Sequence, residues 1–392
     1  MRPLQGITVV ALEHVIAGPF CTRQLADLGA RVIKIERPGV GDPARSYDER
    51  ANGMTSHFVW TNRSKESITL DLKQPEAKDI VLKLLEKADV MVQNLAPGAT
   101  SRMGFSHEAL KERFPGLIVC DISGYGADGP YRDKKAYDLL IQSESGLLSV
   151  TGTADTQVKA GCSIVDISAG MYAYSNILAA LIQRGKTGQG CRIDVSMLES
   201  MCEWMSFPLY YAYDGASPPP RTGAAHATIY PYGPFEVGDG KAVMLGLQNE
   251  REWAVFCDKV LKRPELKSET RFSSSTRRSE SRQELHAIIV DAFSGLTYDE
   301  VVVRLDEAKI GNAAMNDMQQ VWNHAQLDAR NRWVEVDTPR GKIKAMLPPG
   351  IPGSFEPRMD PIPALGEHTD AILEELGYGG ADIERLHDAQ TV

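Results

Sequence analysis

The chain has 392 residues, of which 43% are hydrophobic and 24% are charged. This composition can bury a substantial core, and the length is typical of two domains. A formal net charge of −9 argues against nucleic acid or an anionic membrane as the main partner, so that any polyanion must be bound by a local cluster of cations. The first residues lack the pattern of a secretory signal, which predicts a cytoplasmic protein.

The first two hundred residues alternate predicted strands and helices. An apolar, β-branched run over 7–12 predicts a strand, the spacing over 18–28 predicts a helix, and the alternation over 31–36 predicts a second strand. The rhythm continues through strands at 67–72, 89–95, 117–122 and 192–196, and through helices at 74–88, at 108–114 and after Asp166. Such β-α repetition predicts a mostly parallel sheet covered by helices.

The composition then changes, which suggests domain boundaries. Residues 1–213 are interpreted as the first part of a large domain, 214–229 as a Pro-rich linker, 230–325 as a small domain and 326–392 as a return segment that completes the large domain. Within the small domain, Gly238-Asp-Gly240 predicts a hairpin, and helices are expected at 250–261, 279–293 and 298–308. In the return segment, a loop over 347–353 precedes a helix at 369–376.

Two common ligand motifs are not supported. Gly124, Gly126 and Gly129 match the dinucleotide pattern G-x-G-x-x-G, but the next residues do not open a helix, so no nicotinamide cofactor is expected. The six cysteines and eight histidines are dispersed without metal-ligand spacing, so free thiols and no metal are expected.

Asp166 stands at the head of a long apolar segment, where an unpaired charge is costly. A carboxylate in such a place can attack a thioester carbonyl, and partial desolvation by its apolar neighbours would raise its reactivity and exclude water. Backbone amides at the start of the helix would stabilise the oxyanion. The structural alternative is that Asp166 caps the helix.

Several segments together resemble the class III coenzyme A transferases, a family that includes formyl-CoA transferase, carnitine CoA-transferase and the α-methylacyl-CoA racemases. The resemblance covers nearly the whole chain. It is carried by residues 14–38, 67–73, 93–95, 123–130, 136–138 and 186–190.

The resemblance implies an α/β fold in which a large Rossmann-like domain with a parallel sheet is built from both chain ends. It also implies a smaller α+β domain and an interlocked homodimer. Asp166 is then the nucleophile, and Asp138 falls where the family has an acidic residue beside the thioester. A purely structural role for Asp138 stays open.

Coenzyme A is the implied cofactor, bound as a substrate. The positions that match the family's contacts with it are Ile16, Ala17, Arg37, Leu70, Lys73, Asn94, Leu95, Arg102, Lys135 and Tyr137. Arginine suits bidentate contact with phosphate, and lysine contributes a point charge.

Two departures bear on the substrate. Formyl-CoA transferase has glutamine where this chain has Ile16, and its glycine-rich loop is replaced here by residues 223–235, so formate and oxalate are not the expected acids. The replacement resembles the branch that acts on short dicarboxylic acids such as succinate, mesaconate, itaconate, citramalate or glutarate. A donor for the second carboxylate is expected among His226, Arg45 and Arg221.

The predicted function is transfer of coenzyme A between an acyl-CoA donor and a short carboxylic acid through an aspartyl-CoA thioester. A 2-methylacyl-CoA racemase is one alternative, with Asp166 as an acid/base group. In that branch a histidine stands near the position of Tyr137. A non-catalytic acyl-CoA binding protein is the other alternative.

Overall fold

The computed structural model describes residues 1–350 and 353–392, so the loop predicted over 347–353 lies partly outside the described residues. The chain forms two compact units. Unit 1 comprises Met1–Ser145, Ala160–Ser206 and Gln326–Val392, and unit 2 comprises Gly146–Lys159 and Phe207–Ala325. Each unit is described by itself.

Unit 1 contains a six-stranded sheet in the order β3-β2-β1-β4-β5-β6, in which every neighbouring pair is parallel. The strands are β1 (Thr8–Leu12), β2 (Arg31–Glu36), β3 (Lys65–Thr69), β4 (Val90–Gln93), β5 (Ile118–Ser123) and β6 (Arg192–Ser196). The predicted α/β class with a parallel sheet is confirmed.

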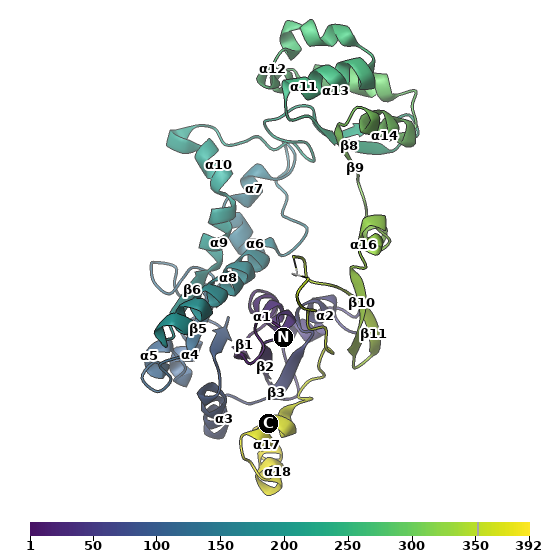
Figure 1. Ribbon diagram of the computed structural model, residues 1–392. Helices are drawn as coiled ribbons and strands as arrows, with labels where there is room; N and C mark the ends of the chain where they lie inside the picture. The colour runs from purple at the N-terminus through teal and green to yellow at the C-terminus, as the bar shows by residue number, and fades with distance from the viewer. Residues whose placement is uncertain (351–352) are drawn as a thin grey trace. The chain divides into compact units, whose positions relative to one another are not determined.

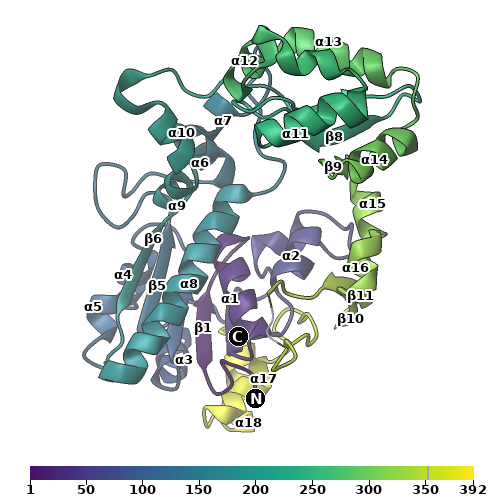
Figure 2. The ribbon, with the colours of Figure 1, turned by 45° about the horizontal axis from the view of Figure 1, so that its top comes forward.

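Helices cover both faces of this sheet, which explains the continuous apolar strands. On one face, Val10, Ile33 and Met91 belong to a core that includes residues of α3 (Pro75–Glu86), α17 (Thr369–Glu375) and α18 (Gly380–Asp388). In Figure 2, α1 (Ala17–Asp27) and α8 (Ile164–Thr187) run side by side, and the two helices are in contact. Segments from both chain ends therefore build unit 1.

The 24-residue helix α8 is the long apolar element of unit 1. It is long and apolar enough to span a membrane by length and composition alone. In the structure it packs against α1, β5 and β6, as the core helix of an α/β unit does. Gly188, in the left-handed region at φ 73°, caps its C-terminus.

Shorter elements complete unit 1. The hairpin β10 (Trp333–Thr338) and β11 (Gly341–Met346) contributes Val336 to a small core with Ala44 and Phe58. The other short elements wholly within this unit are η1 (Pro43–Ser46), α2 (Ser56–Thr61), α4 (Ala99–Met103), α5 (His107–Leu110), α6 (Asp138–Glu144) and α9 (Met197–Trp204).

Unit 2 is built on a three-stranded antiparallel sheet in the order β7-β8-β9. The predicted hairpin joins β7 (Tyr232–Glu236) to β8 (Ala242–Gly246), with Gly240 at φ 77° in the turn. The remaining main elements are β9 (Gly311–Ala314), α11 (Glu250–Val255), η3 (Phe256–Leu261), α12 (Ser275–Glu280), α13 (Arg282–Phe293) and α14 (Tyr298–Glu307). Figure 1 shows these helices and strands in green.

Some predicted bounds differ from the observed ones. The strand expected at 67–72 is β3, which begins at Lys65 and ends at Thr69 because it pairs with β2 from Val32 to Glu36. The hairpin of β10 and β11, the strand β9 and the terminal helix α18 were not predicted.

Candidate functional site

A cavity of about 330 Å³ lies in unit 1 at the carboxyl ends of the parallel strands. It is found where the strand order reverses between β1 and β4, the place where open α/β sheets bind ligands. Its walls come from the segments that follow β1, β2, β4, β5 and β6, together with the start of α8. The lining residues are His14, Val15, Ile16, Ala17, Tyr47, Asn94, Leu95, Ala96, Pro97, Ile122, Ser123, Gly124, Lys134, Lys135, Ala136, Tyr137, Asp138, Asp166 and Met197.

Asp166 lies in the first turn of α8 and lines this cavity. Burial raises the pKa of its carboxyl to about 7, and the negative charge of Asp138 adds to the shift. Within residues 1–350 and 353–392, no side chain or backbone group forms a hydrogen bond or ion pair with this carboxylate. The oxygen atoms of Asp166 therefore stay available to a substrate.

The backbone geometry disfavours the alternative in which Asp166 caps α8. The residue at the N-cap position is Ser163, and Asp166 lies inside the helix. The amides of the first turn are instead bound by Asp138, whose Oδ1 accepts the N–H of Val165 at 2.8 Å and the N–H of Asp166 at 3.3 Å. Asp138 thus has the capping role.

Asp138 is held in place by its neighbours. Gln142, a buried residue on the same helix α6, donates its Nε2–H to Asp138 Oδ2 at 2.6 Å and accepts the N–H of Ala160 at its Oε1. Asp138 thereby fixes the start of α8 and also places a negative charge near Asp166. Its structural and electrostatic roles coexist.

Eight of the residues predicted for the site line the one cavity. They are Ile16, Ala17, Asn94, Leu95, Lys135, Tyr137, Asp138 and Asp166. Two close approaches make this possible. A Cβ on Gly124 would lie 2.1 Å from Ala136 Cβ, so only glycine lets these two loops pack. Asn94 accepts the N–H of His14 at 2.8 Å and donates to its carbonyl at 2.9 Å, which joins the ends of β1 and β4.

Four further predicted residues, Arg37, Leu70, Lys73 and Arg102, do not line the cavity. Leu70 is buried in the sheet core. Arg37 follows β2, Lys73 follows β3 and Arg102 lies on α4 after β4, so all three lie beyond the carboxyl ends of strands, as Lys135 does after β5.

The four basic residues, Arg37, Lys73, Arg102 and Lys135, are all exposed. In the described part of the chain, none of them forms an ion pair with a carboxylate, whereas many other basic residues do. Four exposed basic side chains without ion-pair partners among the described residues therefore lie beyond the carboxyl ends of the parallel strands.

The three candidates for binding a second carboxylate differ in availability. Arg45 in unit 1 is bound bidentately to Glu36 and donates its third nitrogen to the carbonyl of Pro363. Arg221 in unit 2 donates to three backbone carbonyls of residues 149–154.

His226, also in unit 2, accepts the N–H groups of Thr228 and Ile229 at Nδ1. This leaves the proton on Nε2, where it is available for donation. The ring stacks on Tyr232 with centroids 5.3 Å apart.

Tyr47 was missed by the sequence reasoning although it lines the cavity. Its pKa is raised by partial burial and by the negative charges of Asp42 and Asp166. Tyr47 is the cap residue that follows the short helix η1, and no motif or periodicity in the surrounding sequence distinguishes it from an ordinary loop tyrosine.

Comparison with known proteins agrees with this geometry. The chain matches the family model of CoA-transferase family III over residues 4–369. It is 35% identical to succinyl-CoA:glutarate CoA-transferase of Mus musculus over 98% of this chain and 89% of the relative. It is 32% identical to succinyl-CoA:mesaconate CoA-transferase of Haloarcula hispanica over 97% of this chain and 98% of the relative.

Among solved structures, a CAIB/BAIF family protein from Brucella suis is 32% identical and superposes with a TM-score of 0.84. The alignment covers 96% of this chain and 99% of that protein. Family match, sequence identity and fold similarity all extend over nearly the whole chain, and the chain therefore belongs to CoA-transferase family III.

Proposed function

We propose that this enzyme moves coenzyme A from an acyl-CoA donor such as succinyl-CoA to a short dicarboxylic acid such as glutarate or mesaconate, with Asp166 as the covalent carrier. The observation that carries the proposal is the Asp166 carboxylate, which lines the cavity at the switch point of the sheet and is free of hydrogen-bond partners among the described residues. The names of the mouse and Haloarcula relatives support the class of acids.

The chemistry proceeds through four acyl transfers that consume no water. The Asp166 carboxylate attacks the carbonyl of the donor thioester and expels coenzyme A as a thiolate, so that a mixed anhydride of Asp166 and the donor acid forms. The thiolate then attacks the aspartyl carbonyl of this anhydride, which releases the donor acid and leaves an aspartyl-CoA thioester. The acceptor carboxylate attacks that thioester and expels the thiolate again, which forms a second anhydride, and the thiolate then attacks the acceptor carbonyl of this anhydride. Acyl-CoA product leaves, and the Asp166 carboxylate is restored.

Binding of coenzyme A is assigned to the same edge of the sheet. Its phosphates carry negative charge, and Arg37, Lys73, Arg102 and Lys135 are the exposed cations without acidic partners that follow the strands there. The walls formed by Ile16, Ala17, Asn94, Leu95 and Tyr137 surround the position from which the thioester meets Asp166.

For the acceptor, His226 is the proposed donor to the distal carboxylate. Among the described residues, no neighbour accepts a hydrogen bond from His226 Nε2–H. The guanidinium groups of Arg45 and Arg221, by contrast, already donate to neighbouring protein oxygens.

We also propose that unit 1 is a Rossmann-like domain. The strand order β3-β2-β1-β4-β5-β6 supports this, since it is the order of the doubly wound dinucleotide-binding fold.

An interlocked homodimer is proposed as well. Exposed aromatic and apolar side chains support a dimer, because large exposed apolar patches mark interaction surfaces. They include Phe207, Leu209, Tyr210, Tyr211 and Tyr213, which are between 45% and 76% exposed.

The proposal is tested by trapping the intermediate. Wild-type enzyme incubated with succinyl-CoA and then treated with borohydride or hydroxylamine is expected to carry a modification on the peptide containing Asp166, detected by mass spectrometry. Asp166→Asn, which keeps the size of the side chain, is the control and is expected to stay unmodified. An unmodified wild-type enzyme that exchanges the α-proton of a 2-methylacyl-CoA with solvent deuterium would instead identify a racemase.

A further inference from the structure

The backbone at Val15 is strained. Its φ is +65°, in the left-handed region, where a β-branched residue is an outlier. Val15 lies between the end of β1 and the first residue of α1, and both of its neighbours, His14 and Ile16, line the cavity that contains Asp166. Strain of this kind persists only where surrounding contacts impose it.

The peptide groups at His14 and Val15 are bound by side chains from two other segments. The carboxylate of Asp42 accepts the N–H of Val15 with both oxygens, at 3.0 Å and 3.2 Å. Asn94 binds the N–H and the carbonyl of His14. Asn94 is a wall of the cavity, whereas Asp42 is 1% exposed and is not among the residues that line it.

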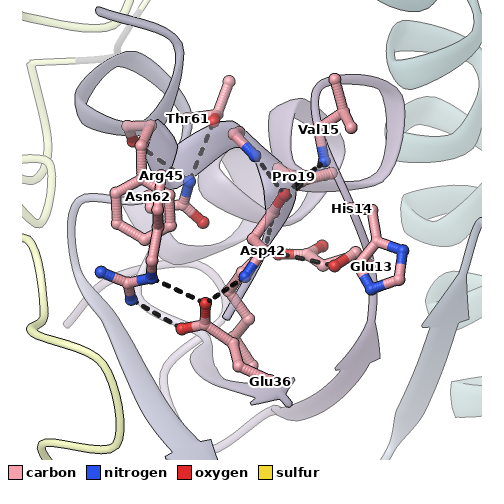
Figure 3. A network of polar contacts seen from close by, with 12 residues as sticks. Glu13, His14, Val15, Pro19, Glu36, Asp42, Arg45, Thr61 and Asn62 are labelled. Carbon is pink, nitrogen blue, oxygen red and sulfur yellow. Dashed lines mark hydrogen bonds and ion pairs between the residues drawn. The ribbon is translucent and has the colours of Figure 1, made fainter. Parts of the chain in front are cut away.

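Asp42 is itself fixed by a buried network, which Figure 3 shows around it. Its Oδ2 accepts a hydrogen bond from Lys34 Nζ at 2.8 Å, its Oδ1 accepts the N–H of Ala44 at 2.9 Å, and its own N–H donates to Glu36 Oε2 at 2.9 Å. Because every polar atom of Asp42 is engaged in this way, its carboxylate has a defined position from which it can hold the Val15 amide.

Two buried lysines extend the network to both sides of Val15. Lys34 donates to the carbonyl and the carboxylate of Glu13. Lys65 donates to Glu13 Oε1 at 2.6 Å and to the carbonyl of Pro19 in the first turn of α1 at 3.0 Å. The side chains of Glu13, Lys34, Asp42 and Lys65 are 0% exposed.

The charges of this network balance, which permits its burial. Glu13, Glu36 and Asp42 supply the negative charges, and Lys34, Lys65 and Arg45 supply the positive ones. No atom of these residues is among the buried polar atoms that lack a partner in the described part of the chain. A fully satisfied charged network on this scale is rigid, so it can hold a strained backbone.

From this geometry we infer that Asp42 is a positioning residue for coenzyme A transfer. It keeps Val15 in the left-handed conformation and thereby sets where the backbone of Ile16 and Ala17 faces the reacting thioester beside Asp166. The expected effect of Asp42 on turnover rests on the proposed function. The claim that Asp42 holds Val15 in the left-handed conformation rests on the backbone geometry alone.

The test is a double-mutant cycle between positions 42 and 15. Asp42→Asn keeps the shape of the side chain but removes the charge that pairs with Lys34. It is expected to lower turnover by roughly 10- to 100-fold, since small displacements of a wall of the site have effects of this size. In the Val15→Gly background, glycine adopts a positive φ without help, so the same Asp42→Asn change is expected to cost roughly tenfold less.

The matched control is Asp27→Asn. Asp27 is also a buried carboxylate in unit 1, bound by Arg23 and Arg63, and it has no contact with Val15. Its effect on turnover is expected to be the same with valine or glycine at position 15. Additive effects for Asp42→Asn, as for the control, would overturn the inference, because a merely structural role is not rescued by glycine at position 15.

A crystal structure of Asp42→Asn separates this inference from the proposed function. Residue 15 is expected to leave the left-handed region, and a φ that stays near +65° would overturn the inference whatever the reaction is. Failure to trap an adduct on Asp166 in the wild-type enzyme, by contrast, would refute the proposed function alone.

If Asp42→Asn does not fold, the inference is tested by comparing the thermal unfolding midpoints of Val15→Ala and Val15→Gly. Both lose the two methyl groups of valine, and alanine is normally the more stabilising residue because glycine loses more backbone entropy on folding. The inference expects the reverse order of thermal unfolding midpoints, with the glycine variant above the alanine variant, and the normal order would overturn it.

Discussion

At the scale of single residues, the chemistry depends on how a carboxylate is kept reactive at neutral pH. Asp166 is desolvated by its own burial and lies near Asp138, and both effects oppose its ionisation. Asp138 can remain close because the amides of Val165 and Asp166 stabilise its charge. The helix start thus supports one carboxylate and leaves the other poorly solvated, which is the condition for a nucleophilic carboxylate.

The pH dependence follows from this arrangement. The nucleophile is the ionised form, and a pKa of about 7 means that Asp166 is largely protonated below neutrality. We expect kcat/KM for the acyl-CoA donor to be constant above pH 8 and to fall about tenfold per pH unit below the pKa. Asp138→Asn removes the neighbouring negative charge and should move the midpoint to lower pH. A midpoint near the ordinary pKa of aspartate in the wild-type enzyme would contradict the assignment.

The acid specificity is also a matter of one side chain. Replacing His226 by alanine removes the Nε2–H donor, so we expect KM for a dicarboxylic acceptor to rise by roughly 10-fold or more, the value of a hydrogen bond to a charged group. The dissociation constant for coenzyme A is expected to change little, and His286→Ala serves as the control because this histidine stacks on Phe235 elsewhere in unit 2. Equal changes for acceptor and coenzyme A would exclude this role for His226.

At the scale of elements, the site depends on how closely α8 approaches α1. Gly170 lies where the two helices meet, and a Cβ there would be 2.8 Å from the carbonyl oxygen of Ala17 and 2.9 Å from Phe20 Cδ1. The backbone of α1 cannot yield as a flexible side chain would. Since Asp166 precedes Gly170 by four residues, it lies on the same face of α8, about one turn before the point where the two helices cross.

This crossing gives a prediction with an internal control. Gly170→Ala should force the helices apart, lower the free energy of unfolding by about 1–3 kcal/mol and reduce turnover by roughly 10-fold or more through displacement of Asp166. Gly185, on the same helix, has nothing within 4 Å of an added Cβ. Gly185→Ala should stabilise the protein by about 0.5–1 kcal/mol without affecting turnover. Chemical denaturation and steady-state kinetics on the two variants measure both effects, and equal behaviour would refute the crossing argument.

At the scale of the whole molecule, the local patterns of the sequence predicted the elements better than their long-range contacts. The strands predicted over Arg31–Glu36 and Arg192–Ser196 are β2 and β6, with the observed bounds. The burial of Lys34 and Lys65 could not be read from the chain, because their partners Glu13 and Asp42 lie on other segments. For the same reason the sequence leaves Arg45 among the candidate carboxylate donors, whereas in the structure its guanidinium is bound to Glu36.

The proposed homodimer is a property of the whole molecule that exposed side chains support. Phe207, Leu209 and Tyr210 are 58%, 56% and 76% exposed, and their solvation is unfavourable in a monomer. We expect sedimentation equilibrium to give a mass about twice the 43.0 kDa of one chain. The double replacement Leu209→Glu and Tyr210→Glu should weaken assembly, whereas glutamate at Val40, which is also exposed but lies in unit 1, should not. A wild-type monomer would refute the homodimer.

An interlocked pair makes a stronger prediction than an ordinary dimer, because two closed rings cannot separate while both chains remain folded. Two batches of enzyme carrying different affinity tags, mixed after purification, should therefore form no doubly tagged dimers even after long dilution. The same batches mixed in urea and refolded together should form hybrids in about half of the dimers, the statistical value for random pairing of identical chains. Hybrids that appear without unfolding would show that the subunits associate face to face and are not interlocked.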